Sequence, residues 1–331
     1  MMNIRQADTQ QQIQFFCDNF RAIHTEVSRM MVGQQAVIEG VLTALCAGGH
    51  VLLEGVPGLG KTMLVSSISR AVNLPFSRIQ FTPDMMPADI QGTSVLMETE
   101  SGGHELTFQP GPIISNLVLA DEINRATPKT QSALLEVMQE KQVTVGRRTI
   151  KLDEPFCVMA TQNPVDQEGT YPLPEAQLDR FLFKLVVGYP TEADYHTIID
   201  RTTSGETIEL NAVASGDILN DMRFIVRNIP VTEAAKTFAI RLVMGTQPQS
   251  AYAPQAVNDC VALGSSPRGI QSLMLAAKVQ ALLAERSEVI EQDIRAVATA
   301  VLRHRLVLNF KAQASGIDAD SLIAQVLEGL Q

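Results

Sequence analysis

Apolar residues near the N-terminus of the chain follow helical spacing. Between residues 9 and 31 they recur every three or four positions, which predicts a helix with one apolar face. This stripe consists of Ile13, Phe16, Phe20, Ile23 and Val27. A second helix is predicted over residues 36–46 and ends at Gly48-Gly49.

Beyond residue 50, short apolar runs alternate with segments of helical spacing. This alternation is typical of an open, mainly parallel sheet with helices between its strands. The predicted strands cover residues 51–54, 76–81, 117–120, 156–161 and 181–187. A sheet of this kind binds its ligand at the carboxyl ends of the strands.

Two stretches interrupt the alternation, and both are predicted to contain β-hairpins. In the stretch 82–112, apolar runs flank a glycine turn at Gly102-Gly103, which predicts a hairpin inserted into a helical connection. In the stretch 142–152, two short runs flank a turn at 146–148. Ordinary surface loops remain an alternative for both.

The pattern after residue 190 is helical only. Helical periodicity covers residues 253–263, 267–284 and 291–305, and the polar stretch 204–216 is predicted to be the loosest joint. We therefore predict three parts. They are an α/β core over 1–190, a helical connector over 191–228 and a helical domain over 229–331.

The composition limits the classes of function. With 331 residues, 45% of them hydrophobic, the chain is long enough for two domains with a real core. Its formal net charge of −10 argues against a protein that coats nucleic acid. Its four cysteines are scattered and its histidines show no ligand spacing, so neither disulfides nor a zinc site is indicated. The N-terminus is polar and no apolar run is long enough to cross a bilayer, so we expect a reduced, cytoplasmic protein.

Residues 55–62, with the sequence GVPGLGKT, fit the P-loop pattern at every fixed position. A predicted strand precedes them and a predicted helix follows. The glycines let successive N–H groups point into one concavity, and the helix adds its positive dipole end. Lys61 can then reach the β- and γ-phosphates, and the Thr62 hydroxyl can coordinate Mg²⁺. The alternative is a chance glycine-rich turn, which the flanking elements disfavour.

Two acids follow the buried strand 117–120, at the end where the P-loop also lies. We expect Asp121 to hold the Mg²⁺ shell and Glu122 to polarise the attacking water. Asn163 closes the next strand, where its carboxamide could orient that water or touch the γ-phosphate. The alternatives are acids that simply end a strand at the surface and an Asn-Pro turn.

Two arginines are singled out by their positions. Arg180 stands directly before the last predicted strand. Arg268 lies in the first turn of a predicted helix, with Ser266 as its cap and Pro267 at its first position. A cation is not favoured near the positive end of a helix, so we expect Arg268 to face an anion from elsewhere. Surface salt bridges are the alternative for both arginines.

These motifs together resemble those of the MoxR family of AAA+ ATPases. The resemblance covers about residues 30–308 and rests on residues 55–62, 121–126, 160–164, 178–181 and 266–268. It implies a P-loop NTPase core with a five-stranded parallel sheet, followed by an all-helical lid domain. The stretches 82–112 and 142–152 sit where related AAA+ proteins, including the magnesium chelatase ATPase subunit, carry a helix-2 insert and a second hairpin.

The resemblance also implies roles for individual residues. Glu122, Asn163, Arg180 and Arg268 match the catalytic glutamate, sensor 1, the arginine finger and sensor 2, and Thr62 and Asp121 match the Mg²⁺ site. The implied nucleotide-binding residues are Gly33, Gln34, Gly55, Pro57, Gly58, Gly60, Lys61, Thr62 and Met63. Arg180 would complete a neighbour's site, whereas Arg268 could act in its own protomer or in the next.

A chaperone-like function follows from the same resemblance. It implies an ATPase with ATP/ADP and Mg²⁺ that assembles as a homo-oligomer, typically a hexameric ring. Such a ring remodels or matures a client protein, often with a partner that carries a von Willebrand factor A domain. Three alternatives stay open, namely a DNA-translocating motor, a magnesium-chelatase-like subunit and a nucleotide-dependent scaffold with little turnover. The basic tip of the second hairpin favours the motor, with Lys141, Arg147, Arg148 and Lys151, but the acidic chain makes nucleic acid an unlikely partner.

Overall fold

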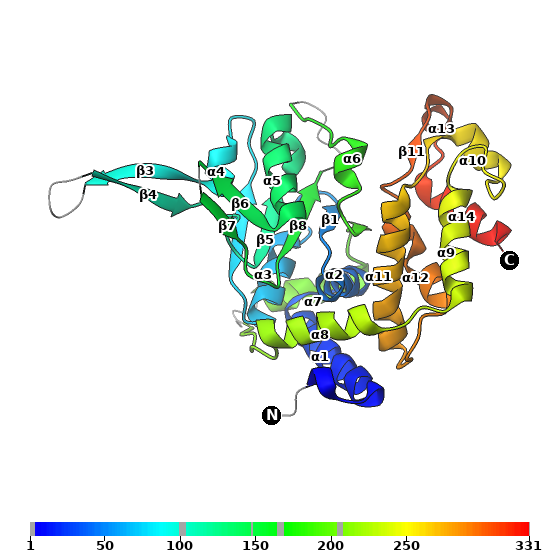
Figure 1. Cartoon of the computed structure of the whole chain (residues 1–331), viewed down its shortest axis with the longest axis horizontal. Helices are drawn as coiled ribbons and strands as arrows, with labels where there is room; N and C mark the ends of the chain where they lie inside the picture. The colour runs from blue at the N-terminus through cyan, green and yellow to red at the C-terminus, as the bar shows by residue number, and fades with distance from the viewer. Residues whose placement is uncertain (1–3, 99–103, 147, 164–168, 204–207, 331) are drawn as a thin grey trace.

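A computed structural model describes residues 4–98, 104–146, 148–163, 169–203 and 208–330. Its centre is a five-stranded sheet in which all neighbouring strands are parallel (Figure 1). In spatial order the strands are β2 (Phe76–Gln80), β5 (Leu117–Asp121), β8 (Cys157–Gln162), β1 (Val51–Glu54) and β9 (Phe183–Val186). All five predicted strands are therefore confirmed, and so is the α/β fold class.

Alternate residues of each strand face opposite layers of helices. In β1, Val51 and Leu53 belong to one apolar cluster and Leu52 to another, and all three are fully buried. The first cluster includes residues of α1 (Thr9–Met30), α2 (Gln35–Ala47) and α3 (Lys61–Ala71). The second includes residues of α5 (Pro128–Glu140). The two N-terminal helices thus form as predicted and cover one face of the sheet.

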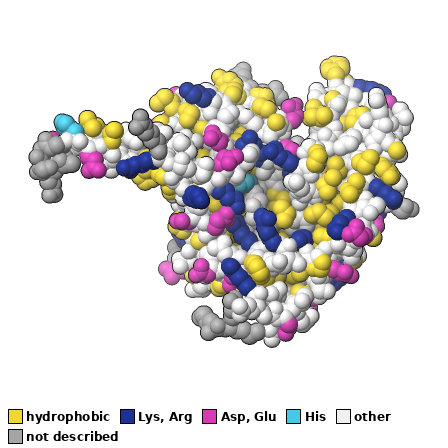
Figure 2. All heavy atoms as spheres, in the orientation of Figure 1, with side chains coloured by type: hydrophobic (Ala, Val, Ile, Leu, Met, Phe, Trp, Pro, Cys, Tyr) yellow, Lys and Arg dark blue, Asp and Glu magenta, His cyan; other side chains and the backbone are white. Residues whose placement is uncertain are grey.

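The stretch 82–112 contains a hairpin that extends far from the body of the molecule (Figure 1). The short helix α4 (Pro87–Gln91) precedes the antiparallel strands β3 (Gly92–Glu98) and β4 (His104–Pro110). The predicted turn at Gly102-Gly103 lies outside the described residues. Apolar side chains of this arm are exposed, as Figure 2 shows, with Leu96 at 62% and Leu106 at 60%.

The helical part of this connection precedes the hairpin. The chain leaves β4 through residues 111–116 directly into β5, and those residues form no helix. A side chain at position 111 would lie 2.2 Å from the Ile90 carbonyl oxygen, so Gly111 allows the two ends of the hairpin to meet. The second predicted hairpin forms from β6 (Gln142–Val145) and β7 (Arg148–Lys151).

The region after residue 190 is mostly but not wholly helical. The prediction of helices only is wrong, because β10 (Val261–Leu263) pairs with β11 (Val307–Leu308) in an antiparallel ladder. The predicted helix over 253–263 is accordingly shorter, and the apolar run at its end is a strand; a short run of this kind fits either structure. The helices are α7 (Glu192–Thr203), α8 (Gly216–Asn228), α9 (Glu233–Gly245), α10 (Gln255–Cys260), α11 (Pro267–Leu283), α12 (Glu291–Leu302), α13 (Phe310–Ala314) and α14 (Ala319–Gly329).

The polar joint 204–216 is anchored where it is described. The backbone N–H groups of Val213 and Ala214 both donate to the Ala71 carbonyl at the end of α3. The first apolar cluster continues from the sheet through α8 into α9, α11, α12 and α14, so the helical domain shares one core with the sheet. Among the described residues, no helix is both long enough and apolar enough to span a bilayer.

Candidate active site

The P-loop connects β1 to α3 and curls because two of its glycines adopt left-handed backbone angles. Gly58 has φ 86° and Gly60 has φ 77°, a region that favours glycine. A Cβ atom on Gly55 would lie 2.7 Å from the carbonyl oxygen of Val187, the residue after β9, so the loop passes too close to it for a side chain there. Lys61 and Thr62 are the first two residues of α3, and both are half-buried. Their N–H groups are among the unpaired donors of the helix N-terminus, where an anion is favoured.

Lys61 folds back onto its own loop. Its ammonium group donates hydrogen bonds to the carbonyls of Gly55 and Val56, the latter at 3.1 Å. Burial lowers the pKa of Lys61, and the nearby charges of Asp121 and Glu122 partly oppose that shift. The cation is thus held at the mouth of the loop, within the field of both acids.

The two acids lie at the carboxyl end of β5, and Thr161 of β8 joins them. The Thr161 hydroxyl donates to Asp121 Oδ1 at 2.6 Å and accepts from the Glu122 N–H at 2.8 Å. Arg78 of β2 donates to Asp121 Oδ2 at 2.6 Å, so both oxygens of this buried carboxylate are engaged. Sequence reasoning missed Thr161 and Arg78. Thr161 lies near the end of β8, which was an available signal, whereas Arg78 lies in the middle of β2 and had none.

Glu122 has an uncommon backbone conformation, with φ 57° and ψ 47°. A residue other than glycine rarely adopts these angles, and such outliers cluster at functional sites. Its carboxylate forms an ion pair with Arg125, 3.0 Å from Nε to Oε2. Asn163 is buried directly after β8, at the same edge of the sheet. The structure therefore brings Lys61, Asp121, Glu122 and Asn163 to one edge, as the sequence predicted.

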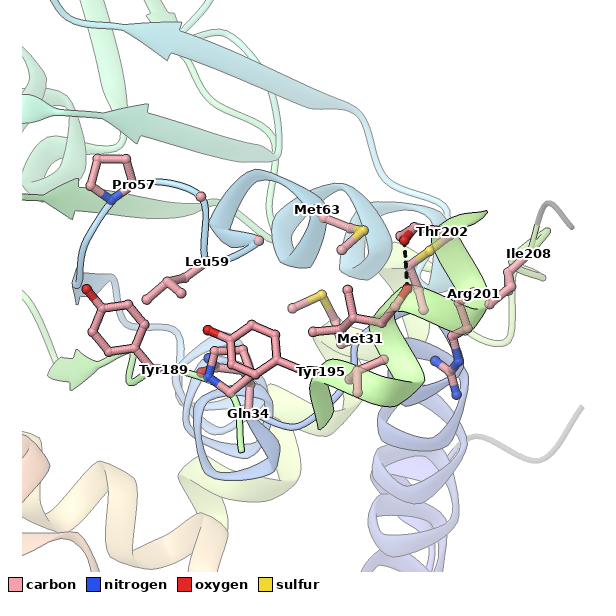
Figure 3. Close-up of a pocket in the computed structure, with 16 residues that line it drawn as sticks. Met31, Gln34, Pro57, Leu59, Met63, Tyr189, Tyr195, Arg201, Thr202 and Ile208 are labelled. Carbon is pink, nitrogen blue, oxygen red and sulfur yellow. Dashed lines mark hydrogen bonds between the residues drawn. The ribbon is translucent and has the colours of Figure 1, made fainter. Parts of the chain in front are cut away.

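Beside the P-loop is a cavity of about 470 Å³ (Figure 3). The P-loop contributes Pro57, Gly58, Leu59 and Gly60, and the predicted adenine segment contributes Gln34. Further lining residues are Met30, Met31, Val32, Met63, Tyr189, Pro190, Tyr195, Ile198, Arg201, Thr202 and Ile208. An apolar cavity with a few polar groups is typical of a small-molecule site.

The far wall of this cavity is α7, which the sequence did not identify as part of the site. Gln34 donates to the Gly188 carbonyl at 2.8 Å, and Gly33, with φ 66°, packs against α7. A Cβ atom on Gly33 would lie 2.9 Å from a carboxylate oxygen of Asp194. Of the helical domain, none of the described residues 229–330 lines the cavity. The walls of this cavity therefore come from the core and from α7.

Arg180 and Arg268 lie at the opposite end of the sheet from the P-loop, where the strands begin. The Leu182 N–H donates to the His50 carbonyl at 2.8 Å, and His50 precedes β1 whereas the P-loop follows it. Arg180 is half-buried and donates to the Leu135 carbonyl of α5. Arg268 lies in the first turn of α11, capped by Ser266 as predicted, and its Nη1 is 4.0 Å from Asp179. The structure thus places both arginines near Asp179 and separates them from their own P-loop by the length of β1.

Two family models match the chain. Residues 50–183 match the ATPase family associated with various cellular activities (AAA), and residues 253–326 match the AAA lid domain. Chaperone MoxR1 of Mycobacterium tuberculosis is 46% identical over 92% of this chain and 79% of its own length. The uncharacterized protein YeaC of Bacillus subtilis is 44% identical over 92% of each chain. Protein MoxR of Methylorubrum extorquens is 31% identical over 86% of each.

A solved structure is also closely similar. A Cytophaga hutchinsonii protein, provisionally described as an ATPase, superposes with a TM-score of 0.90 at 38% identity, over 97% of this chain and 96% of its own. These relatives support the same family assignment as the sheet order, the P-loop and the acids after β5. The chain belongs to the MoxR family of AAA+ ATPases.

Proposed function

We propose that this chain hydrolyses ATP to ADP and phosphate within a ring of identical subunits, and that the ring remodels or matures a client protein complex. One observation carries the proposal of a ring. The P-loop lies at the carboxyl end of β1 and the acids at that of the parallel strand β5, whereas Arg180 and Arg268 lie toward the amino end of β1. An arginine that stabilises a leaving γ-phosphate must reach it, so these arginines need the P-loop of a second copy.

The P-loop edge provides what phosphate binding needs. The phosphates would be bound by Lys61, by the backbone N–H groups that the glycines of the P-loop orient, and by the N-terminus of α3. Mg²⁺ fits the donors present, because the Thr62 hydroxyl and the Asp121 carboxylate are hard oxygen ligands, and Arg78 and Thr161 already orient that carboxylate. When bound, the ion would neutralise charge on the phosphate oxygens.

Glu122 and Asn163 would act on the water that attacks the γ-phosphate. Glu122 is the group that can accept its proton, and Asn163 can orient it through its neutral amide. The ion pair of Glu122 with Arg125 orients the carboxylate before the substrate arrives. The base and ribose would occupy the apolar cavity, where Gln34 and the residues of α7 form the walls.

The ring assignment also gives a role to Arg268. Because Arg268 lies near Asp179 and far along β1 from its own P-loop, it would serve the same neighbouring nucleotide as Arg180. The proposal therefore places sensor 2 in trans, the point that sequence reasoning left open. Both arginines would stabilise the negative charge that develops during phosphoryl transfer.

The test is turnover and assembly of two variants. Lys61→Ala should lose ATP binding, whereas Glu122→Gln should bind ATP and lose about 10²–10⁴-fold in kcat. Sedimentation of Glu122→Gln with ATP should show a closed oligomer of defined size. Unchanged turnover in both variants would refute the hydrolytic site, and a monomer at every protein and ATP concentration would refute the ring.

The client and the partner are proposed from the family. The relative named as a chaperone supports a remodelling role, and the exposed apolar arm β3–β4 offers a surface on which a client could bind. We expect Glu122→Gln with ATP to retain a purified von Willebrand factor A domain protein encoded beside its gene. Equal retention with ADP or without nucleotide would argue against a nucleotide-driven partnership.

The DNA-motor alternative gains no support from the second hairpin. The ammonium group of Lys141 forms an ion pair with Glu154, which also pairs with Arg223. Arg147 lies outside the described residues. Among the described cations of this hairpin, Arg148 and Lys151 are exposed.

A further inference from the structure

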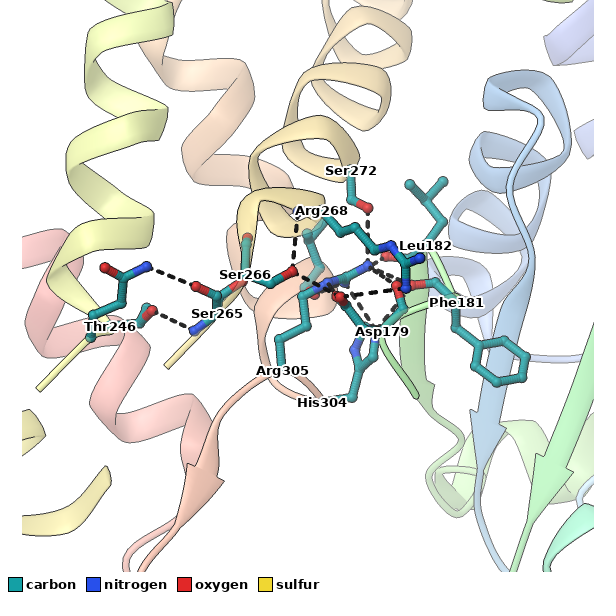
Figure 4. Close-up of polar contacts among 12 residues, drawn as sticks. Asp179, Phe181, Leu182, Thr246, Ser265, Ser266, Arg268, Ser272, His304 and Arg305 are labelled. Atoms are coloured by element: carbon teal, nitrogen blue, oxygen red, sulfur yellow. Dashed lines mark hydrogen bonds and ion pairs between the residues drawn. The ribbon is translucent and has the colours of Figure 1, made fainter. Parts of the chain in front are cut away.

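A cluster of polar contacts that includes Arg268 joins the core to the helical domain (Figure 4). At its centre is Asp179, the residue before Arg180. Its Oδ1 accepts from Arg305 Nε at 2.8 Å, and its Oδ2 accepts from the Ser266 hydroxyl at 2.8 Å. Arg305 follows α12 and Ser266 caps α11, so one carboxylate of the core holds two parts of the helical domain.

Arg305 holds the backbone on both sides of Arg180. Its Nη2 donates to the carbonyls of Asp179 at 3.3 Å and Phe181 at 2.7 Å, and its Nη1 donates to the Leu182 carbonyl at 3.3 Å. Only 1% of the Arg305 side chain is exposed. This guanidinium thus forms hydrogen bonds to the residues before and after Arg180.

The same cluster fixes Arg268. The Ser266 hydroxyl that donates to Asp179 also accepts from the Arg268 N–H at 3.1 Å. The start of α11 is therefore bound to the loop that carries Arg180. Any movement of one arginine backbone must move the other or break these contacts.

Stability alone is a poor explanation for this arrangement. Burying an ion pair costs desolvation, and well-packed apolar residues often serve stability as well or better. A guanidinium with several donors in a fixed plane is suited to holding several carbonyls in one geometry. The contacts converge on the segment 179–182, whose side chains include the proposed arginine finger.

We propose that Asp179 and Arg305 are positioning residues, which clamp Arg180 and Arg268 as one unit directed at the nucleotide of the neighbouring subunit. The inference rests on the proposed function, since it requires both arginines to act in trans. It adds two residues to the site. Asp179 belongs to the motif 178–181 but had no role assigned to it, and Arg305 lies outside the AAA core.

The experiment compares Asp179→Asn and Arg305→Lys with a matched control. Asp179→Asn keeps the shape but removes the charge, and Arg305→Lys keeps the charge but removes the planar set of donors. The control is Asp293→Asn, which breaks another buried carboxylate–arginine pair of the helical domain, with Arg286 Nη1 at 2.8 Å.

Both test variants should lose about tenfold to hundredfold in kcat, since misplacement by about 1 Å can cost that much. KM for ATP and affinity for ADP should not change, because the P-loop and cavity lie at the other end of β1. The control should melt earlier with unchanged kcat.

Mixing subunits separates positioning from folding. Glu122→Gln subunits, added in excess, have a dead site of their own but intact arginines for their neighbours. In this mixture, turnover per Asp179→Asn subunit should equal the turnover per wild-type subunit in a mixture of wild type with the same excess of Glu122→Gln. Arg305→Lys subunits should recover in the same way. Arg180→Ala provides the reference, because it must also recover if the arginine acts in trans.

The outcomes are distinct. Recovery of Arg180→Ala without recovery of the two positioning variants would overturn this inference and leave the proposed function intact. Wild-type kcat in both unmixed variants would also overturn it. Failure of Arg180→Ala to recover would refute the arrangement in trans, and the inference with it. Should Asp179→Asn not fold, Arg305→Lys and Ser266→Ala, which retain the buried charge pair, decide the question.

Discussion

His50 makes the stability of this protein depend on pH. Its ring is buried before β1, where Nε2 donates to the Met138 carbonyl at 3.0 Å and Nδ1 accepts from the Val158 N–H at 3.0 Å. A proton on Nδ1 would remove the second bond and place an unpaired charge in the core. Burial therefore lowers the pKa of His50 to about 4, with Lys141 and Arg223 acting in the same direction against the bond to Met138.

The sign and size of this pH dependence follow from the linkage between proton binding at His50 and folding. Between about pH 4 and the ordinary histidine pKa of about 6.5, the unfolded chain binds a proton at this position and the folded chain does not. Stability is therefore lost as the pH falls through that window and changes no further below it. From pH 7 to pH 5 the loss from this one group is about 2 kcal/mol, at 1.36 kcal/mol per pKa unit.

The assay is urea unfolding of wild type and His50→Asn at pH 7 and pH 5. The asparagine oxygen can accept from Val158 but does not titrate, so the variant should be less stable at pH 7 and lose about 2 kcal/mol less on acidification. The buried His304, whose pKa is also lowered, contributes equally to both proteins and cancels. His104→Asn, on the exposed arm, is the control and should match wild type. An unchanged pH dependence in His50→Asn would refute this assignment.

Two further predictions concern the nucleotide site. Thr161→Val removes the hydroxyl shared by Asp121 and Glu122, so ATP turnover should fall at least tenfold while the affinity for ADP stays the same. Thr161→Ser, which keeps the hydroxyl, should restore turnover. Equal turnover in wild type and both variants would contradict a role of Thr161 in orienting these acids. The helix α7 should become protected from hydrogen exchange when ADP binds, because none of its residues is buried and it forms a wall of the cavity; equal protection with and without ADP would exclude that contact.

Local sequence patterns predicted the parts of the site that depend on short spacing. The P-loop, the acids after β5 and Asn163 each follow a strand within a few residues, so their placement requires only the order of elements along the chain. The same is true of Ser266 as the cap of α11. These features were predictable because one element fixes each of them.

The features that were missed depend on contacts between distant parts of the chain. Asp179 and Arg305 are 126 positions apart, and neither belongs to a pattern that predicts the other. Arg78 reaches Asp121 from a neighbouring strand 43 positions away. The ladder of β10 with β11 likewise joins residues that lie far apart, so periodicity alone assigned Val261–Leu263 to a helix. Only the unfavourable position of Arg268 at a helix N-terminus hinted at such a partner.

The strand β9 connects the two halves of the proposed mechanism within one protomer. Asp179 and Arg180 precede it, and Tyr189 and α7 follow it. The contacts of Asp179 with Arg305, here called the clamp, and the wall of the cavity are therefore attached to opposite ends of this four-residue strand. The clamp end is fixed by a buried guanidinium, whereas α7 has no buried residue and is the part free to respond to a nucleotide. We therefore expect protection of α7 by ADP to persist in Asp179→Asn, because the contacts of the cavity do not depend on the clamp. Loss of that protection would mean that both ends of β9 move as a single unit, and that the clamp also reports on the subunit's own nucleotide.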